Sequence, residues 1–585
     1  MNPSPTPTMQ ELLDGYYRSI KKAFYWILFF SFFINALMLA LPLYMLQIYT
    51  RVLPSQSMDT LIYLTLIVII ILAIFALLSS VRTYMLIELS TWLDHELSAL
   101  AFKKMPDQVL ENNEYAQHAF LDVLTIRQFL TSGGVTALLD FPWSSIYIAV
   151  IFLLYSWLGV FSLVAGALLF AFAVLNEIST KTQVIKSTTQ FKKNQVFIQS
   201  ISKNSDTLQA MGLTENLQNL WLKNNHEALT LHKETSKKSE IYLSIIKFLR
   251  VTAQVFILGL GAYFVLQNEI TTGAMLAASI LMSRALAPIE QAVSSWKLFI
   301  QFRDAMQRLR YYLKMPESRL KTMRLPDPIG KIFLENVYYS YPSVAQYALQ
   351  QMTLIIQPGD LVAVAGPSAS GKTTLCRIIL GILNPKIGKA KLDGGDIYHR
   401  DRTEIGKWLG YLPQDIELFS GTIKDNIARM GEVDSSEVVE AAKIAGAHEM
   451  ILNLPQSYDT KIEGTKGLSA GQMQRIGLAR ALYKNPKVVV LDEPYSNLDT
   501  EGEEALLKAI IELKRRKTTT IIISHRIDLI RNVDKIIYLL GGKLKYYGPR
   551  DDVLNALQKE LSAKNQPIKG LPDEPGKQSD SPKQP

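Results

Sequence analysis

Long apolar runs without a charged side chain fill much of the first half of the chain. Residues 23–50 and 60–81 contain no Asp, Glu, Lys or Arg, and neither does the stretch 141–176. A helix needs about 20 apolar residues to cross the hydrocarbon core of a bilayer. The first two runs therefore predict one membrane helix each. The third is too long for one crossing. Together with the uncharged residues before Asp140, it predicts two helices that turn near residues 156–159.

Two further spans are predicted at residues 241–266 and 270–297. The sixth span is the least regular, because Arg284 and Glu290 interrupt it. Charged side chains inside a span face protein or a water-filled cavity rather than lipid, so we expect both residues to point away from lipid. Several charge-free runs of this length argue against a soluble protein with very apolar helices. The pattern predicts a membrane α-helical bundle with six transmembrane helices.

Basic residues orient these spans. Arg18, Lys21 and Lys22 precede the first helix, and lysines are frequent in the long loop between the fourth and fifth spans. The positive-inside rule therefore places both termini in the cytoplasm, together with the two long loops, residues 83–130 and 178–240. These loops are polar but patterned like helices. We expect the membrane helices to continue through them into the cytoplasm.

The pattern changes near residue 331, where strands such as KIFLENVYYSY and DLVAVAG alternate with helices. Such alternation is typical of an α/β domain. The last residues are polar and rich in proline, and we expect them to be disordered. The expected organisation is an N-terminal cytoplasmic segment (1–22), a transmembrane domain with cytoplasmic extensions (23–303), a basic linker (304–330), an α/β domain (331–560) and a tail (561–585).

Composition narrows the class of protein. The chain has 62 Lys and Arg against 53 Asp and Glu, a net charge of +9. That excess alone would also fit a nucleic-acid-binding protein, but the apolar runs favour a membrane protein. The single cysteine, Cys376, excludes an internal disulfide, and we interpret it as a packing residue. The N-terminal MNPSPTPT lacks the features of a signal peptide, so we expect the first membrane helix to act as the targeting signal.

A phosphate-binding loop is predicted at residues 366–374, GPSASGKTT, which match the pattern G-x-x-x-x-G-K-[ST]. The stretch follows the strand LVAVA and opens a helix, which is the context that this motif requires. Backbone N–H groups would cradle the phosphates, Lys372 would add a positive charge, and the Thr373 hydroxyl would ligate Mg²⁺. The predicted nucleotide-binding residues of this loop are Gly366, Pro367, Ser368, Ala369, Ser370, Gly371, Lys372, Thr373 and Thr374.

Two adjacent acids end the apolar strand KVVVLDE at residues 487–493. Asp492 at the strand end suits a Mg²⁺ ligand. Glu493 leaves the strand on the opposite side, which suits a general base that polarises the attacking water. A solvated turn is the alternative, and the apolar strand and the upstream phosphate loop disfavour it. His525 follows the strand TTIIIS, where it could hydrogen-bond the γ-phosphate.

Two further positions complete the predicted nucleotide site. Gln414 in YLPQD lies between a strand and a helix, where it could reach Mg²⁺ or the attacking water. Tyr341 in YYSYP could stack on adenine. Aromatic residues in strands usually pack in the core, and Tyr338 and Tyr339 stay open as alternatives for this role.

A second anion site is predicted at GLSAGQMQR, residues 467–475, because small residues at a helix N-terminus leave backbone N–H groups free. The motifs in this order resemble the ABC ATPase family over residues 331–560. In that family the LSGGQ-type segment faces the nucleotide held by a second domain. The resemblance therefore implies a homodimer in which Ser469, Gly471 and Gln472 contact the nucleotide bound at Lys372 of a second copy. It also places SNLD, residues 496–499, along the same interface.

The chain departs from the family pattern at Ala470, where glycine is usual. A methyl group is tolerated there if the φ of that residue is negative. Because the flanking positions are intact, we expect ATP hydrolysis at two identical sites rather than a purely regulatory nucleotide site.

Six spans followed by one ATPase domain resemble a type I ABC exporter half-transporter. In that family the cytoplasmic extensions carry coupling helices, which we place near Asn112–His118 and Gly212–Trp221. The resemblance implies that ATP closes the dimer and switches the membrane domains from inward-open to outward-open.

The stretches LPLYMLQIYTRVLPSQSMDTLIYLT and LLDFPWSSIYIAVIFLLYSWLG are similar to the inner-membrane ATPases of bacterial type I secretion systems. The similarity is greatest to the branch that exports proteases and haem-scavenging proteins and lacks an N-terminal peptidase-like domain. It implies ATP- and Mg²⁺-dependent export of an unfolded polypeptide with a C-terminal signal. It also implies a periplasmic adaptor (membrane fusion) protein and a TolC-type outer-membrane channel.

Two other functions stay open. A lipid or drug flippase of the same architecture would have a wide apolar cavity, whereas a charge-lined canal, with Arg250 and Arg284 as candidates, would favour a polypeptide. A membrane sensor gated by ATP is the second alternative, and the intact Glu493 and His525 argue against it. For Asp140 and Pro142, a structural kink is favoured over contact with the substrate.

Overall fold

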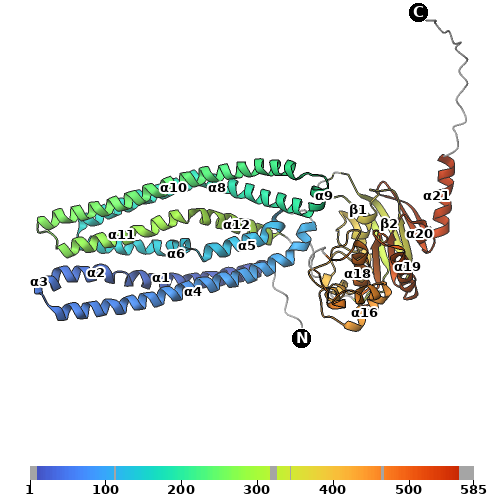
Figure 1. The fold of residues 1–585 in the computed structure, drawn as a ribbon, viewed down its shortest axis with the longest axis horizontal. Helices are drawn as coiled ribbons and strands as arrows, with labels where there is room; N and C mark the ends of the chain where they lie inside the picture. Colours follow the sequence, from blue (N-terminus) through green and yellow to red (C-terminus); the bar gives the residue numbers. More distant parts are fainter. Residues whose placement is uncertain are drawn as a thin grey trace, which may run out of the picture. The chain divides into compact units, whose positions relative to one another are not determined.

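The computed structural model describes residues 9–110, 114–315, 326–342, 344, 346–462 and 467–564. The chain divides into two compact units, Met1–Pro316 and Glu317–Pro585. Figure 1 shows long helices in the first unit and a sheet with shorter helices in the second.

The described residues of the first unit form helices and the turns between them (Figure 1). Its helices are α1 (Met9–Leu37), α2 (Ala40–Gln47), α3 (Leu53–Ser55), α4 (Met58–Leu110), α5 (Glu114–Leu130), α6 (Gly133–Asp140), α7 (Ser144–Leu154), α8 (Ser156–Lys203), α9 (Ser205–Ala210), α10 (Thr214–Leu266), α11 (Thr272–Ser294) and α12 (Trp296–Lys314), with a π-helix at Ile48–Val52 and a 3₁₀ turn at Phe141–Trp143.

Six segments of the described chain are long and apolar enough to cross a bilayer, which confirms the predicted number of spans. They are Arg18–Ser55, Met58–Leu110, Gly133–Leu154, Ser156–Lys203, Thr214–Leu266 and Thr272–Ser294. Helices α4 and α10 each have 53 residues. At 1.5 Å per residue, each is about 80 Å long, well beyond the roughly 30 Å of a bilayer core. The excess length forms the extensions that the polar, helix-patterned loops predicted.

A buried polar network surrounds Asp140 at the end of α6. The Asp140 carboxylate forms an ion pair with Arg82 of α4 at 2.7 Å and accepts a hydrogen bond from the Asn35 amide of α1 at 2.8 Å. Arg82 also donates to the hydroxyl of Ser31, and the Tyr147 hydroxyl donates to the Asn35 side chain. Asp140 therefore joins three helices, and the 3₁₀ turn Phe141–Trp143 that follows it separates α6 from α7.

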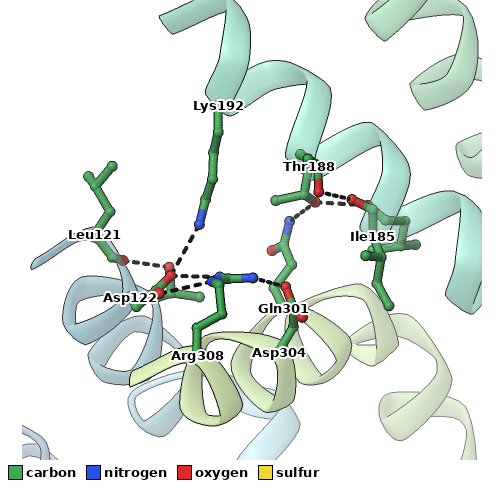
Figure 2. Close-up of polar contacts among 11 residues, drawn as sticks. Leu121, Asp122, Ile185, Thr188, Lys192, Gln301, Asp304 and Arg308 are labelled. Carbon is green, nitrogen blue, oxygen red and sulfur yellow. Dashed lines mark hydrogen bonds and ion pairs between the residues drawn. The ribbon is translucent and has the colours of Figure 1, made fainter. Parts of the chain in front are cut away.

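A second cluster joins α5, α8 and α12 around the buried carboxylate of Asp122 (Figure 2). Arg308 of α12 donates to both carboxylate oxygens, from Nη2 at 2.6 Å and from Nε at 2.9 Å. Lys192 of α8 reaches the same carboxylate at 3.1 Å, and Asp304 pairs with Arg308. Figure 2 shows the two basic side chains converging on Asp122 from different helices. We call these four residues the Asp122 cluster.

The boundary predicted for the linker at residue 304 differs from the structure, because α12 continues to Lys314. The reason is its amphipathic pattern: Ala305, Leu309 and Tyr312 are buried against α4 and α5. Residues 316–325 lie outside the described residues.

Of the two regions expected to hold coupling helices, the structure describes the second completely and the first only in part. Part of Asn112–His118 lies outside the described residues, which resume at α5. In the second region, Gly212 adopts a positive φ of 62° after the short helix α9, and the residues from Thr214 to Trp221 form the first turns of the long helix α10.

The second unit contains a mixed sheet covered by helices. Its strands are β1 (Ile332–Tyr339), β2 (Leu349–Ile356), β3 (Leu361–Ala365), β4 (Ile387–Leu392), β5 (Gly395–Asp396), β6 (Leu409–Leu412), β7 (Gly421–Thr422), β8 (Lys461–Ile462), β9 (Val488–Asp492), β10 (Thr519–Ile523), β11 (Lys535–Leu540) and β12 (Lys543–Pro549). Its helices are α13 (Lys372–Ile379), α14 (Arg402–Ile405), α15 (Ile423–Ile427), α16 (Ser435–Ile444), α17 (His448–Leu452), α18 (Ala470–Leu482), α19 (Thr500–Arg515), α20 (Ile527–Ile530) and α21 (Arg550–Lys564), with a 3₁₀ turn at Ser457–Asp459.

Ten strands pair in the order β5-β4-β1-β2-β12-β11-β3-β10-β9-β6, and β7 pairs with β8. Strands β11, β3, β10, β9 and β6 are parallel neighbours. Every residue of β9 and β10 is buried, as expected for strands covered on both faces. Because parallel strands end at the same edge, the segments that follow β3, β6, β9 and β10 meet there.

Cys376 lies on α13 and is fully buried in the core of this unit. Burial raises the pKa of its thiol well above the ordinary value. The interpretation of Cys376 as a packing residue is confirmed.

Candidate nucleotide-binding site

The carboxyl edge of the parallel strands brings together four segments that are far apart in the sequence. The loop 366–371 follows β3, Gln414 follows β6, Glu493 follows β9 and His525 follows β10. Ligands of open α/β sheets bind at this edge. Most of the side chains predicted for nucleotide chemistry therefore share one edge, although up to 159 positions separate them (525 − 366).

Glycines allow the phosphate loop its tight path. Gly366 and Gly371 have φ values of 147° and 96°, which side chains other than glycine rarely adopt. A Cβ at Gly366 would lie 2.3 Å from the Leu539 carbonyl oxygen, and one at Gly371 would lie 2.7 Å from that of Ala348. Helix α13 begins at the next residue, so its free N–H groups point into the loop.

Lys372 is only 7% exposed, and its ammonium group lies inside the loop. It donates to the carbonyl oxygens of Gly366 at 2.9 Å and Pro367 at 2.8 Å. Burial lowers the pKa of Lys372, and the charges of Glu493 and Asp492 act in the opposite direction. A buried cation held by two carbonyls, rather than by a carboxylate, is available to an anion that enters the loop.

Asp492 and Ser370 carry buried polar atoms that the described residues leave without hydrogen-bond partners. These atoms are both carboxylate oxygens of Asp492 and the hydroxyl of Ser370. Burial raises the pKa of the Asp492 carboxyl, while Thr373, Arg377 and Lys372 act in the opposite direction. A buried carboxylate whose hydrogen-bonding capacity is not filled is costly. Its position beside the Thr373 hydroxyl fits a hard divalent cation with oxygen ligands.

Glu493 and Gln414 meet at the open side of this edge. The Gln414 amide donates to the Glu493 carboxylate at 3.0 Å. Glu493 has a positive φ of 49° directly after β9, and its own N–H donates to the Ile523 carbonyl of β10. This turn directs Glu493 away from the buried side of the strand where Asp492 lies. Neither residue is deeply buried, so the carboxylate is accessible to water.

Tyr341 lies beside the first turn of α13, where its hydroxyl is 3.2 Å from the Thr374 hydroxyl. Tyr339 is buried in the core and packs against Tyr341 with ring centroids 5.1 Å apart. Tyr338 packs against Tyr347 instead. Of the three tyrosines, Tyr341 is the one beside the phosphate loop. His525 is exposed just beyond the end of β10.

Ser469 begins α18 with a capping box. Its hydroxyl accepts from the Gln472 N–H at 3.2 Å, and the Gln472 side chain accepts from the Ser469 N–H at 2.9 Å. No hydrogen bond joins Ser469, Gly471 or Gln472 to the loop 366–374 among the described residues of this chain. Ala470 is the first residue of α18 and has no positive φ, so its methyl group is tolerated as expected.

The segment SNLD contacts this helix. A Cβ at Gly471 would lie 2.9 Å from the carbonyl oxygen of Asn497, which requires glycine at this position. Sequence reasoning did not identify the side chains that hold α18 there. Gln474 donates to the Pro494 carbonyl at 2.9 Å, and Arg475 pairs with Asp499 at 2.7 Å. The sequence does show two adjacent polar residues, Gln474 and Arg475, directly before the apolar part of α18. The structure buries both of them.

Two sequence families match the chain. The family described as ABC transporter matches residues 349–496, and the family described as ABC transporter transmembrane region matches residues 24–288. Among solved structures, a bacterial Atm1-family ABC exporter with ATP bound is similar with a TM-score of 0.76 and 20% identity. The match covers 94% of this chain and 99% of that one. This similarity shows the fold.

Curated relatives narrow the family. The type I secretion system ATP-binding protein PrsD of Rhizobium meliloti is 35% identical, over 94% of this chain and 95% of the relative. The exotoxin translocation ATP-binding protein PaxB of Pasteurella aerogenes is 28% identical, over 91% of this chain and 76% of the relative. The alpha-hemolysin translocation ATP-binding protein HlyB of Escherichia coli is 28% identical, over 92% of this chain and 77% of the relative. The chain therefore belongs to the ABC transporter family, as a membrane-spanning ATPase of the type I secretion group.

Proposed function

We propose that this protein exports unfolded polypeptides through a type I secretion system, driven by ATP hydrolysis. The observation that carries the proposal is the 35% identity to a type I secretion system ATP-binding protein over 94% of the chain, membrane helices included. A match confined to the ATPase domain would indicate only ATP hydrolysis, because that domain occurs with many cargoes.

In the proposed nucleotide site, the phosphates of ATP replace the two carbonyl oxygens that now accept from Lys372. Residues 366–374 surround the phosphates with backbone N–H groups, and Tyr341 stacks on adenine. Thr373, Gln414 and Asp492 would hold Mg²⁺, whose charge neutralises the phosphate oxygens. The orphaned oxygens of Asp492 support this assignment.

Glu493 acts as the general base in this proposal. Its accessible carboxylate polarises the attacking water, and the hydrogen bond from Gln414 fixes its orientation. His525, at the end of the neighbouring strand, contacts the γ-phosphate. These roles separate the two acids: Asp492 is buried and suits a cation, whereas Glu493 is accessible and suits a proton acceptor.

A second copy of the chain completes each site. Ser469, Gly471 and Gln472 have no contact with the phosphate loop of their own chain among the described residues, and they lie at an exposed or half-exposed helix start. That arrangement supports a two-fold homodimer in which α18 of one chain caps the nucleotide bound by the other. ATP then favours the closed dimer because it contacts both chains only in that state.

The remaining parts of the assembly follow from the secretion group. We place the protein in the bacterial inner membrane with both termini in the cytoplasm. A periplasmic adaptor and a TolC-type outer-membrane channel would continue the path. We place one coupling element near Gly212–Trp221, where α10 begins, and the other near Asn112–His118. The lysine-rich loop 178–240 supports this orientation.

Comparison of culture media tests the proposal. The gene is deleted in the source bacterium and restored with the wild-type chain or with Glu493→Gln. We expect one or a few proteins to leave the medium on deletion, to return with the wild type and to stay absent with Glu493→Gln. An unchanged set of secreted proteins, with altered membrane lipids or drug resistance, would instead favour a flippase.

A further inference from the structure

Helix α11 presents a polar strip on the surface of the described chain. Arg284, Gln291 and Ser294 are exposed, and Ala287 between them is half-buried. Their spacing of three and four residues places them on one face of the helix. The other faces of α11 are largely buried against neighbouring helices. We call these four residues the α11 strip.

The strip differs from the surfaces that face lipid. Helix α4 exposes a continuous series of large apolar residues, among them Ile67, Ile70 and Leu77. None of the large apolar side chains of α11, whose residues are all described, is exposed. Lipid favours apolar side chains, so the exposed face of α11 fits water or another polypeptide rather than lipid.

Arg284 lies near the middle of the span. It follows Thr272, the first residue of α11, by 12 positions (284 − 272), which is about 18 Å along a helix. A bilayer core is about 30 Å thick. An arginine that faces lipid at this depth is unfavourable, and such side chains face protein or a water-filled cavity. No ion pair or hydrogen bond to the Arg284 guanidinium is formed within the described residues.

In the described chain, the acids of α6 and α11 are already paired. Glu290 pairs with Arg250 at 2.6 Å, and Asp140 belongs to the network with Arg82. The runs 23–50, 60–81 and 141–176 contain no acid, nor do residues 241–268. A second copy would bring the same paired acids together with another Arg284. These segments therefore leave the Arg284 guanidinium available to a carboxylate from outside them.

We infer that the α11 strip lines a water-filled path through the membrane and that Arg284 binds carboxylates of an acidic polypeptide in transit. A guanidinium group binds carboxylates bidentately, and Gln291 and Ser294 can hydrogen-bond the backbone of an extended chain. This inference rests on the proposed export of polypeptides, and it adds that the exported polypeptide carries negative charge. Arg284 acts here as a specificity-determining residue.

Thiol labelling tests the water-filled path. Ala287→Cys and Gln291→Cys are compared with Ile70→Cys in the full-length protein in nanodiscs. Ile70 is the matched control, because it also follows the first residue of its helix by 12 positions (70 − 58). The native Cys376 is buried. We expect a charged thiol reagent to label the two α11 variants at least about tenfold faster than Ile70→Cys. Equal rates would overturn the inference.

Peptide binding tests the charge preference. The probes are a fluorescent unstructured peptide of Gly, Ser and Glu and its counterpart with Gln in place of Glu. We expect the Glu peptide to bind the wild type about fivefold more tightly, as for a solvated ion pair. Arg284→Lys should keep this preference and Arg284→Gln should lose it. Lys247→Gln, which removes an exposed charge from α10, is the control and should keep it.

The outcomes separate this inference from the function on which it rests. If Arg284→Gln keeps the preference, or if the wild type binds both peptides equally, polypeptide export stands and the role of Arg284 is overturned. If neither peptide binds the wild type or changes its ATP hydrolysis, both polypeptide export and the role of Arg284 fail.

Discussion

The Gln414 amide donates a hydrogen bond to the Glu493 carboxylate at 3.0 Å, although the two residues are 79 positions apart. The contact exists because the parallel strands β6 and β9 are neighbours and end at the same edge. It leaves Glu493 oriented and accessible, while Asp492, one residue earlier, is buried. Two adjacent acids thus have different environments, which is the basis for assigning them different roles.

Glu493→Gln should therefore stop turnover without preventing ATP binding. A positioned general base contributes about 10²–10⁴-fold to a rate, so we expect steady-state hydrolysis to fall at least about 100-fold. ATP affinity should stay within about threefold of the wild type, because Glu493 does not belong to the phosphate loop. Phosphate release and nucleotide binding measure the two effects. Glu504→Gln, at an exposed position of α19, is the control. Hydrolysis near the wild-type rate would remove Glu493 from the role of base.

Lys372→Ala should weaken ATP binding itself. In the proposed site, the buried ammonium group of Lys372 is the cation that contacts the phosphates. Losing charge-assisted hydrogen bonds costs roughly 1.5–3 kcal/mol, so we expect the dissociation constant to rise about 10–100-fold. Equilibrium binding of a fluorescent ATP analogue measures it. Lys389→Ala removes an exposed lysine of β4 and should have no effect. An unchanged affinity in Lys372→Ala would contradict the assignment of the phosphate loop.

Cross-linking between chains tests the shared site. Ser368 in the phosphate loop and Ser469 at the start of α18 are both exposed. Chains with Ser368→Cys are mixed with chains carrying Ser469→Cys, and a short thiol cross-linker is added. We expect a product with the mass of two chains, and more of it when Mg²⁺ and ATP are present. Each variant alone serves as the control. A mixture that yields no more product than the single variants would argue against the reciprocal dimer.

Removal of the buried acid in the Asp122 cluster should destabilise the first unit. Arg308 and Lys192 would keep their charges without the carboxylate they now share (Figure 2). Breaking a buried ion pair costs about 3–5 kcal/mol, so we expect Asp122→Asn to lower the unfolding temperature by at least about 5 °C. Asp206→Asn, at an exposed position of α9, should leave it within about 1 °C. Equal unfolding temperatures would mean that the cluster does not stabilise the helices.

The sequence predicted features that depend on local patterns. Charge-free runs predicted four of the six spans, and two apolar stretches with a few charges predicted the others. The phosphate loop was recognisable because its residues are adjacent and lie between a strand and a helix. Gln414 and Glu493 could be related because alternating strands and helices predict a parallel sheet with one shared edge. The partners of Asp122 and Asp140 were not predictable. These partners lie on helices 58 to 186 positions away in the sequence. No simple sequence rule predicts which helices of a bundle pack against each other.

Capture of the cargo tests polypeptide export most directly. Glu493→Gln is expressed in the source bacterium, and the cells are treated with a cross-linker. The purified protein is then analysed by mass spectrometry, with the wild type as the reference. We predict enrichment of a periplasmic adaptor and of a polypeptide attached through its C-terminal region. Lipid as the sole enriched component, without adaptor or polypeptide, would contradict polypeptide export and favour a flippase.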